Sequence, residues 1–127
     1  MPEIAPTSIA PTAATYAHAV LTVDARRWVH TSGVVPIAPD GSVPGGIEAQ
    51  ADVVWSNLAA ILAEADMGPA DVVSVTTYVV HGEDLAPVMA ARDRALAGHR
   101  AASTLVTVPA LARAEWRMEI AVIAAGE

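Results

Sequence analysis

The chain has 127 residues, of which 54% are hydrophobic, and it carries a formal net charge of −7. It contains no cysteine, which excludes disulfide bonds, thiolate metal sites and a thiol nucleophile. A phosphate backbone is bound by clustered Lys and Arg residues, whereas the seven such residues of this chain form no long basic run. We therefore expect no nucleic-acid partner.

The length and the hydrophobic content favour one domain over residues 1–127 that associates with copies of itself. A domain this small cannot easily bury every apolar face on its own, which favours a homo-oligomer. The N-terminus lacks the basic and apolar regions of a signal peptide, and the apolar runs are too short for a membrane span. We expect a soluble, cytoplasmic protein with no membrane partner.

The first half of the chain predicts two strands and one helix. Residues 1–15 are rich in Pro, Ala and Thr and are expected to form an extended arm. Two short strands are predicted over 16–23 and 27–35, and a loop dense in turn residues follows over 36–46. The apolar spacing then changes to steps of three and four residues, which predicts an amphipathic helix over 47–66.

The second half predicts strand, helix, strand and strand. β-branched residues over 72–80 indicate a central strand that is apolar on both faces. Asp84 is expected to cap a helix that ends at Gly98, and further strands are predicted over 102–108 and 115–125. The order ββαβαββ is typical of an α+β fold in which two helices cover one face of a sheet.

The histidines do not predict a metal site. No two of them share the spacing of a metal-binding pair, and each is interpreted as a surface or partly buried residue. His81 has somewhat more promise than the others, because it follows the central strand and strand ends often face pockets. The four histidines are His18, His30, His81 and His99.

Two polar positions near the N-terminus have alternative interpretations. Ser32 is either a catalytic hydroxyl or part of a bulge that Gly33 allows, and the bulge is favoured because no nucleophile-elbow motif surrounds it. Tyr16 is either an aromatic residue at the edge of the core or a hydroxyl directed at a ligand.

The last predicted strand carries a carboxylate at the point where its polar face becomes apolar. Alternation places Glu119 on one face and Met118 and Ile120 on the other, and beyond Glu119 the polar face continues with Ala121 and Ile123. One interpretation is a solvated face with a carboxylate at its end. The other is a partly desolvated carboxylate that serves as a general base.

In this order, several segments resemble the Rid/YjgF family of enamine and imine deaminases, also known as L-PSP endoribonuclease-like proteins. The match covers nearly the whole chain, and the ordered set of motifs is more specific than any one of them. The matching segments are Tyr16 after the arm, "TSG" at 31–33, "EAQADVVWSNLAAILAEAD" with Gln50 and Asn57, "DVVSVTTYVV", the helix from "EDLAPV", and "MEIAVIA" at 118–124.

The resemblance implies an α+β, chorismate-mutase-like fold assembled as a homotrimer, with ligand sites in clefts between neighbouring subunits. It also implies hydrolysis of enamines and imines to 2-oxo acids and ammonia without a cofactor or metal. The glutamate of the family's "EI" motif, which positions the attacking water, corresponds to Glu119. Tyr16, Ser32 and Gly33 correspond to positions that line the cleft.

Two positions depart from the family pattern. The family's arginine that grips the substrate carboxylate falls opposite Ala102, and the asparagine usual in the second helix is replaced by Met89. Arg100 lies two positions before Ala102, and it is either a substitute that reaches back into the cleft or an exposed residue at the junction of helix and strand. Thr104, further along the same strand, is also expected to contribute to substrate binding.

Three functions follow as hypotheses. The first is a Rid-type hydrolase in which Glu119 activates water at a C=N or enamine carbon of a small-molecule substrate. The second is a trimer that binds a small molecule without catalysis, which the absent arginine and asparagine favour. The third, ribonuclease activity, follows only from the family's older name, and the acidic charge argues against it.

Overall fold

A computed structural model describes residues 2–127. Its centre is a four-stranded sheet with the strand order β3-β6-β4-β5. Strand β6 runs antiparallel to both of its neighbours, whereas β4 and β5 are parallel to each other. Parallel neighbours need a crossover connection, which helix α2 supplies. The strands are β3 (Arg27–His30), β4 (Val72–Val80), β5 (Ala102–Val108) and β6 (Met118–Gly126).

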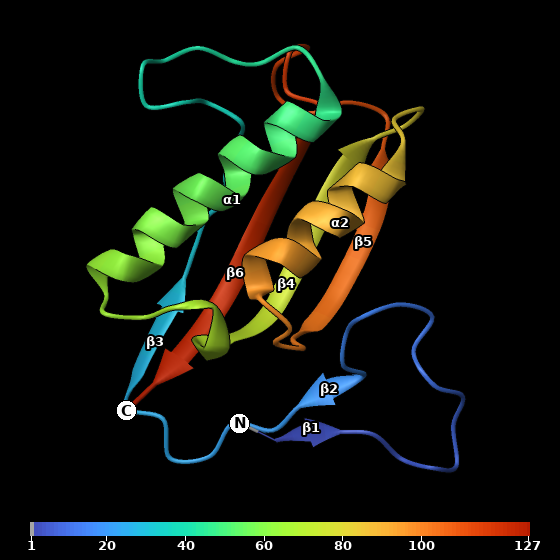
Figure 1. The fold of residues 1–127 in the computed structure, drawn as a ribbon, viewed down its shortest axis with the longest axis vertical. Helices are drawn as coiled ribbons and strands as arrows, with labels where there is room; N and C mark the ends of the chain where they lie inside the picture. Colours follow the sequence, from blue (N-terminus) through green and yellow to red (C-terminus); the bar gives the residue numbers. More distant parts are fainter. Residues whose placement is uncertain (1) are drawn as a thin grey trace.

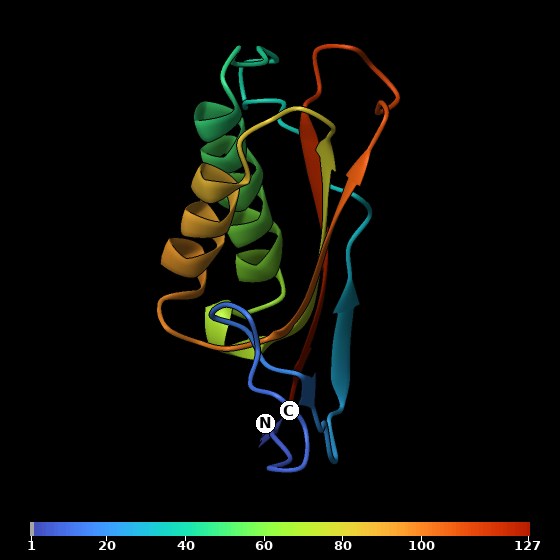
Figure 2. The ribbon, with the colours of Figure 1, turned by 90° about the vertical axis from the view of Figure 1, so that its right-hand side faces the viewer.

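Two helices, α1 (Ile47–Glu64) and α2 (Leu85–Leu96), lie side by side across one face of this sheet (Figure 1). In the view of Figure 2 both helices lie on the same side of the sheet. A 3-10 turn, η1 (Pro69–Asp71), connects α1 to β4. This arrangement confirms the predicted α+β fold with helices on one face. No helix within residues 2–127 has the length and apolar character needed to span a bilayer.

The hydrophobic core lies between the helices and the sheet. Met118, Ile120 and Val122 of β6 are buried toward the helices, because alternate side chains of a strand point to opposite faces. From α1 the core receives Ala51, Val54, Trp55, Leu58 and Leu62, and from α2 it receives Val88, Ala91 and Leu96. The apolar spacing that predicted α1 therefore also identifies the face that this helix buries.

The opposite side of the sheet, here called the open face, consists of the alternate residues of all four strands. It carries Trp28 and His30 of β3, Ser74, Thr76 and Tyr78 of β4, Ala102, Thr104 and Val106 of β5, and Glu119, Ala121 and Ile123 of β6. The prediction that β4 is apolar on both faces is therefore wrong, because Ser74, Thr76 and Tyr78 make most of its open face polar. The cross-strand register places Tyr78 between Glu119 and Val106.

Local signals set the ends of α2. The Asp84 carboxylate accepts a hydrogen bond from the Ala86 backbone N–H at 3.1 Å, which confirms the predicted N-cap. At the other end, Ala97 and Gly98 adopt positive φ angles of 50° and 85°. In the loop before α1, Ser42 donates from its hydroxyl and its backbone N–H to Asp40, and these hydrogen bonds lower the pKa of that carboxyl.

The N-terminal prediction needs a correction. Within 16–23 only β2 (Ala19–Val20) is a strand, and it pairs with β1 (Glu3–Ile4) of the arm in a separate two-stranded sheet. The Leu21 N–H likewise donates to the Pro2 carbonyl at 2.9 Å. The backbone of this segment therefore finds its partners in the arm, and only an isolated bridge from Ala17 reaches β5.

Candidate functional site

The centre of the candidate site is Glu119, the second residue of β6. Its neighbours Met118 and Ile120 are fully buried in the core, and this anchors the strand with the Glu119 side chain on the open face. Glu119 is half-buried, and its cross-strand neighbour on β4 is Tyr78. Strand alternation thus presents one carboxylate on a face without helices, as the sequence predicted.

A β-bulge places Gly33 against that carboxylate. His30 pairs with Ile123, and pairing resumes where Val34 bonds with Ile120, so one extra residue lies on the β3 side. The Thr31 side chain fills the gap in the ladder, because its Oγ1 accepts from the Val122 N–H at 3.0 Å. The bulge that Gly33 was expected to allow is therefore present.

The contact between Gly33 and Glu119 leaves no room for a side chain. A Cβ atom built on Gly33 would overlap the Glu119 Oε2 atom and lie 2.9 Å from Cδ. Ser32, the other bulge residue, is exposed. Ser32, Gly33 and Glu119 therefore form one group, in which the backbone at the bulge borders the carboxylate.

Gly33 also lines a shallow open groove of about 470 Å³ between the bulge segment and α1. The groove is mainly apolar, and its one amide side chain, Asn57, donates to the Ile37 carbonyl at 2.8 Å. The groove therefore offers apolar contact next to the group formed by Ser32, Gly33 and Glu119. Its lining residues are Gly33, Val34, Val35, Ile37, Asn57, Ala60 and Ile61.

A second group of predicted residues gathers at β5, which is an edge strand. The segment that follows the arm runs beside the start of this strand, where the Ala17 N–H donates to the Ala101 carbonyl at 2.9 Å and Ala17 bridges to Ala102. This contact brings the half-buried Tyr16 next to Ala102, and Thr104 follows on the open face. Met89 is half-buried on α2.

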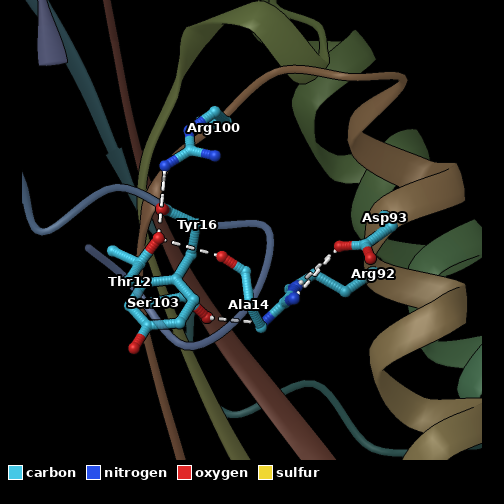
Figure 3. Close-up of polar contacts among 7 residues, drawn as sticks. All are labelled: Thr12, Ala14, Tyr16, Arg92, Asp93, Arg100 and Ser103. Atoms are coloured by element: carbon cyan, nitrogen blue, oxygen red, sulfur yellow. Dashed lines mark hydrogen bonds and ion pairs between the residues drawn. The ribbon is translucent and has the colours of Figure 1, made fainter.

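Arg100 is engaged by the arm (Figure 3). Its guanidinium donates to Glu3 at 2.9 and 3.2 Å, to the Thr12 hydroxyl at 3.3 Å and to the Tyr16 carbonyl at 2.6 Å. These contacts hold the arm on the main sheet. In this conformation the guanidinium is occupied by the chain itself, and nothing in its contacts supports a role as a substitute for the family's arginine.

Replacing Arg100 with alanine is expected to loosen the arm with little loss of global stability. The ion pair with Glu3 is partly exposed, with side-chain exposures of 38% and 31%, so we expect a loss of about 1 kcal/mol or less. Limited proteolysis should cleave residues 2–16 several times faster than in the wild type. The matched control is Arg94→Ala, which removes an exposed ion pair to Asp52; equal cleavage rates in both variants would contradict the anchoring role.

The group around Glu119 and the group at β5 do not meet within one chain. Strand β4 lies between β6, which carries Glu119, and β5, which carries Ala102. Two strand spacings separate these strands by about 10 Å, before the offset along the strands is added. A single chain therefore presents the carboxylate group and the β5 group as separate surfaces.

The sequence interpretation overlooked two residues near these groups. Tyr78 borders Glu119 on the open face, but its strand was expected to be uniformly apolar. Arg92 is 5% exposed and contacts Ser103 of β5. The sequence spacing could have indicated its burial. Arg92 lies four residues after Val88 and four before Leu96, and therefore within the apolar stripe of α2.

The histidines lie apart from one another. The His99 Nε2 atom is 2.6 Å from the Val72 carbonyl, the His18 Nε2 atom is 2.7 Å from the Ala10 carbonyl, and His30 packs beside Trp28. His81 is exposed at the end of β4. Across residues 2–127, no three His, Asp or Glu side chains gather in an arrangement suited to a metal ion.

Two sequence relatives are similar over part of their length. A RutC family protein of Haemophilus influenzae is 39% identical over 93 residues, which are 72% of this chain and 66% of the relative. TdcF of Escherichia coli, provisionally named a reactive intermediate deaminase, is 30% identical over 67 residues, which are 52% of each chain. The chain thus matches between about half and two thirds of the length of these relatives.

Solved structures extend the similarity to nearly the whole chain. The Rid protein YyfB of Yersinia pestis, whose function is unknown, superimposes with a TM-score of 0.88 at 33% identity and covers 98% of this chain and 97% of its own. E. coli TdcF with bound serine gives a TM-score of 0.73 at 25% identity and covers 97% and 94%. The family model described as Endoribonuclease L-PSP matches residues 7–126. The chain therefore belongs to the endoribonuclease L-PSP family, which includes the Rid and YjgF proteins.

Proposed function

We propose that the protein is a Rid-type hydrolase that converts a small imine or enamine into a carbonyl compound and ammonia. The observation that carries the proposal is the half-buried Glu119 carboxylate on the open face, bordered by the backbone of Gly33. A general base must lie within hydrogen-bond reach of the proton it removes, and the open face leaves one side of this carboxylate to solvent and ligand.

The reaction needs only water and proton transfer. An enamine first takes a proton on carbon to become an iminium ion (an imine substrate is protonated on nitrogen), and Glu119 then accepts a proton from water as its oxygen bonds to the C=N carbon. Glu119 returns this proton to the nitrogen of the resulting carbinolamine, the C–N bond breaks to release ammonia, and the hydroxyl proton leaves to solvent as the carbonyl forms. No electrons are gained or lost overall, so the proposed chemistry requires no redox cofactor.

TdcF supports the size and class of the substrate. This relative is provisionally named a reactive intermediate deaminase, and its crystal structure contains bound serine. By analogy, we propose that the substrate of the present protein is amino-acid-sized. The apolar groove beside Gly33 suits a short side chain on such a substrate.

We further propose that the protein is a homotrimer with its sites between subunits. The open face exposes Trp28 by 49% and Val106 by 40%, and apolar surface of this kind is suited to a protein partner. A second copy placed over this face would bring Glu119 of one chain to the β5 edge of another, which joins the two groups that one chain keeps apart. Analytical ultracentrifugation at micromolar concentration tests this part of the proposal.

The alternative is a trimer that binds a small molecule without catalysis. Two observations favour it, because the methyl group of Ala102 and the thioether of Met89 offer no charged hydrogen bond to a substrate carboxylate. Glu119 favours the hydrolase, since a half-buried carboxylate on this face can serve as the general base. A cytoplasmic location stays a prediction from the sequence.

The two functions are distinguished by an imine-trapping assay. An amino-acid oxidase generates 2-iminopropionate from alanine, and semicarbazide traps the imine that remains unhydrolysed. We expect micromolar protein to lower the trapped fraction relative to the spontaneous reaction, and an imine without a carboxylate provides a second substrate. Binding of a stable ligand in calorimetry, without any change in the trapped fraction for either imine, would favour the alternative.

A further inference from the structure

Arg92 is a charged residue in an unusual position, on the side of α2 that packs against the sheet. Its side chain is only 6% exposed. Removing a guanidinium from water is unfavourable unless its charge is paired and its N–H groups find acceptors. The partners of Arg92 therefore decide whether this burial is explained by the chain itself.

The chain satisfies this guanidinium only in part. Of its five N–H groups, one at Nε donates to the Asp93 Oδ1 atom at 3.1 Å, and one at Nη1 donates to the Ser103 hydroxyl at 3.3 Å. The buried Nη2 lies 3.1 Å from the same Asp93 oxygen but is poorly aligned, and among residues 2–127 it has no hydrogen-bond partner. The aligned contacts thus use two of the five donors.

Asp93 is a weak counter-ion for this position. It is the adjacent residue on the helix, it reaches Arg92 through a single oxygen, and its side chain is 40% exposed. A partly solvated carboxylate of this kind can turn out to water at little cost. Its place beside the guanidinium is therefore open to exchange with another anion.

The guanidinium lies beside β5, the edge strand of the sheet. Figure 3 shows Arg92 extending from α2 toward Ser103 of β5. Within residues 2–127, Ala17 of the N-terminal segment bridges the outer edge of β5 at Ala102, immediately before Ser103. A ligand that takes the place of Asp93 would meet the Nε and Nη2 edge of the guanidinium, while Ser103 contacts Nη1.

We infer that Arg92 is the carboxylate-binding residue of this protein, supplied by α2 instead of by β5. A ligand carboxylate would replace that of Asp93 on Nε and Nη2, in the paired geometry that guanidinium and carboxylate groups favour. The Ser103 hydroxyl accepts from Nη1 on the other side of the guanidinium and so holds the Nε and Nη2 edge in position for the ligand. The ligand class is a small carboxylate of amino-acid size.

This inference rests on the proposed function for the identity of the ligand. It also explains how a ligand carboxylate could be bound although position 102 carries alanine in place of the family's arginine. Ser103 points to the helix side, whereas Glu119 of the same chain lies on the open face. A substrate held by Arg92 could therefore be reached only by the Glu119 of a second copy, which the proposed sites between subunits would supply.

The test measures binding without turnover. L-serine and L-serine amide differ only in the carboxylate, and calorimetry gives the affinity of the full-length protein for each. We expect the wild type to bind L-serine more tightly than its amide. Arg92→Gln should lose at least tenfold in affinity for L-serine and should no longer distinguish it from the amide. Asp93→Asn should bind L-serine severalfold more tightly than the wild type does. Arg94→Gln, an exposed arginine on the same helix, is the matched control and should bind as the wild type does.

The tighter binding of Asp93→Asn separates a binding role from a merely structural one, since a structural ion pair would only be weakened. If Arg92→Gln does not fold, Ser103→Ala replaces it and should weaken L-serine binding severalfold. Wild-type affinity in Arg92→Gln, weaker binding in Asp93→Asn, or equal affinity of the wild type for serine and its amide would overturn the inference. Because no turnover is measured, the inference can hold when imine hydrolysis fails, and it can fail when hydrolysis is present.

Discussion

Gly33→Ala is expected to remove most of the activity while the protein stays folded. The new methyl group would occupy the space of the Glu119 Oε2 atom, and the carboxylate, at the end of a flexible side chain, must turn away. Positioned general bases contribute roughly 10²- to 10⁴-fold to rate, so we expect kcat to fall by about 100-fold or more. The change should be measured in the imine-hydrolysis assay, alongside thermal unfolding.

The matched control for this variant is Gly45→Ala. Gly45 has no neighbouring heavy atom within 4 Å of an added Cβ, so the same chemical change there meets open space. We expect the control to turn over substrate at the wild-type rate. Both variants should have a thermal stability close to that of the wild type. Full activity in Gly33→Ala would mean that the position of the Glu119 carboxylate against the bulge is irrelevant to the reaction.

Gln50→Ala is expected to cause the largest loss of stability among the polar substitutions discussed. The amide is 1% exposed, and its Nε2 donates to the carbonyls of Pro44 and Glu115, both at 2.8 Å. Its Oε1 accepts from the Arg117 N–H, also at 2.8 Å. One side chain on α1 thus fixes the loop before the helix and the loop before β6. Losing these bonds and leaving a cavity should lower the free energy of unfolding by roughly 2–4 kcal/mol.

Two comparison variants separate the causes of that loss. Gln50→Glu keeps the volume but cannot donate to the two carbonyls, so it should be destabilised nearly as much at neutral pH. Asn57→Ala, on the same helix, removes a single bond to the Ile37 carbonyl and should cost about 1 kcal/mol. Denaturant unfolding at one fixed protein concentration measures all three, and a Gln50→Ala value within 1 kcal/mol of the wild type would contradict this account.

The predictable features of the fold are those encoded by neighbouring residues. The three- and four-residue spacing from Ile47 indicated α1, Asp84 indicated the start of α2, and alternation around Glu119 indicated which face carries the carboxylate. Each of these signals acts within one or two turns of helix or a few residues of strand. Local physical chemistry was sufficient for them.

The features that the sequence did not reveal depend on contacts between distant segments. Arg100 and Glu3 lie 97 positions apart, and no local pattern links them. The pairing of β1 with β2 likewise decides whether residues 16–23 join the main sheet, which the periodicity of either segment cannot indicate. Arg92 differs, because its place in an apolar stripe was visible in the sequence, but its partner on β5 was not.

The candidate site divides in the same way. The bulge at Gly33 and the face of Glu119 follow from the strand pattern, and the structure adds that the two are in contact. The relation of Ala102 and Thr104 to Glu119 depends on strand order, since β4 lies between their strands. Strand order is set by tertiary pairing, which one sequence alone specifies only through resemblance to a known fold.

The central claim is that Glu119 acts on water at an imine carbon. The most direct measurement is kcat/KM for hydrolysis of 2-iminopropionate by the wild type, by Glu119→Gln and by the surface variant Glu64→Gln. We predict that Glu119→Gln lowers kcat/KM by roughly 100-fold or more, because an amide cannot accept the proton of the attacking water. Glu64→Gln should retain the wild-type value. Hydrolysis at the wild-type rate in Glu119→Gln, with the protein folded, would contradict the account.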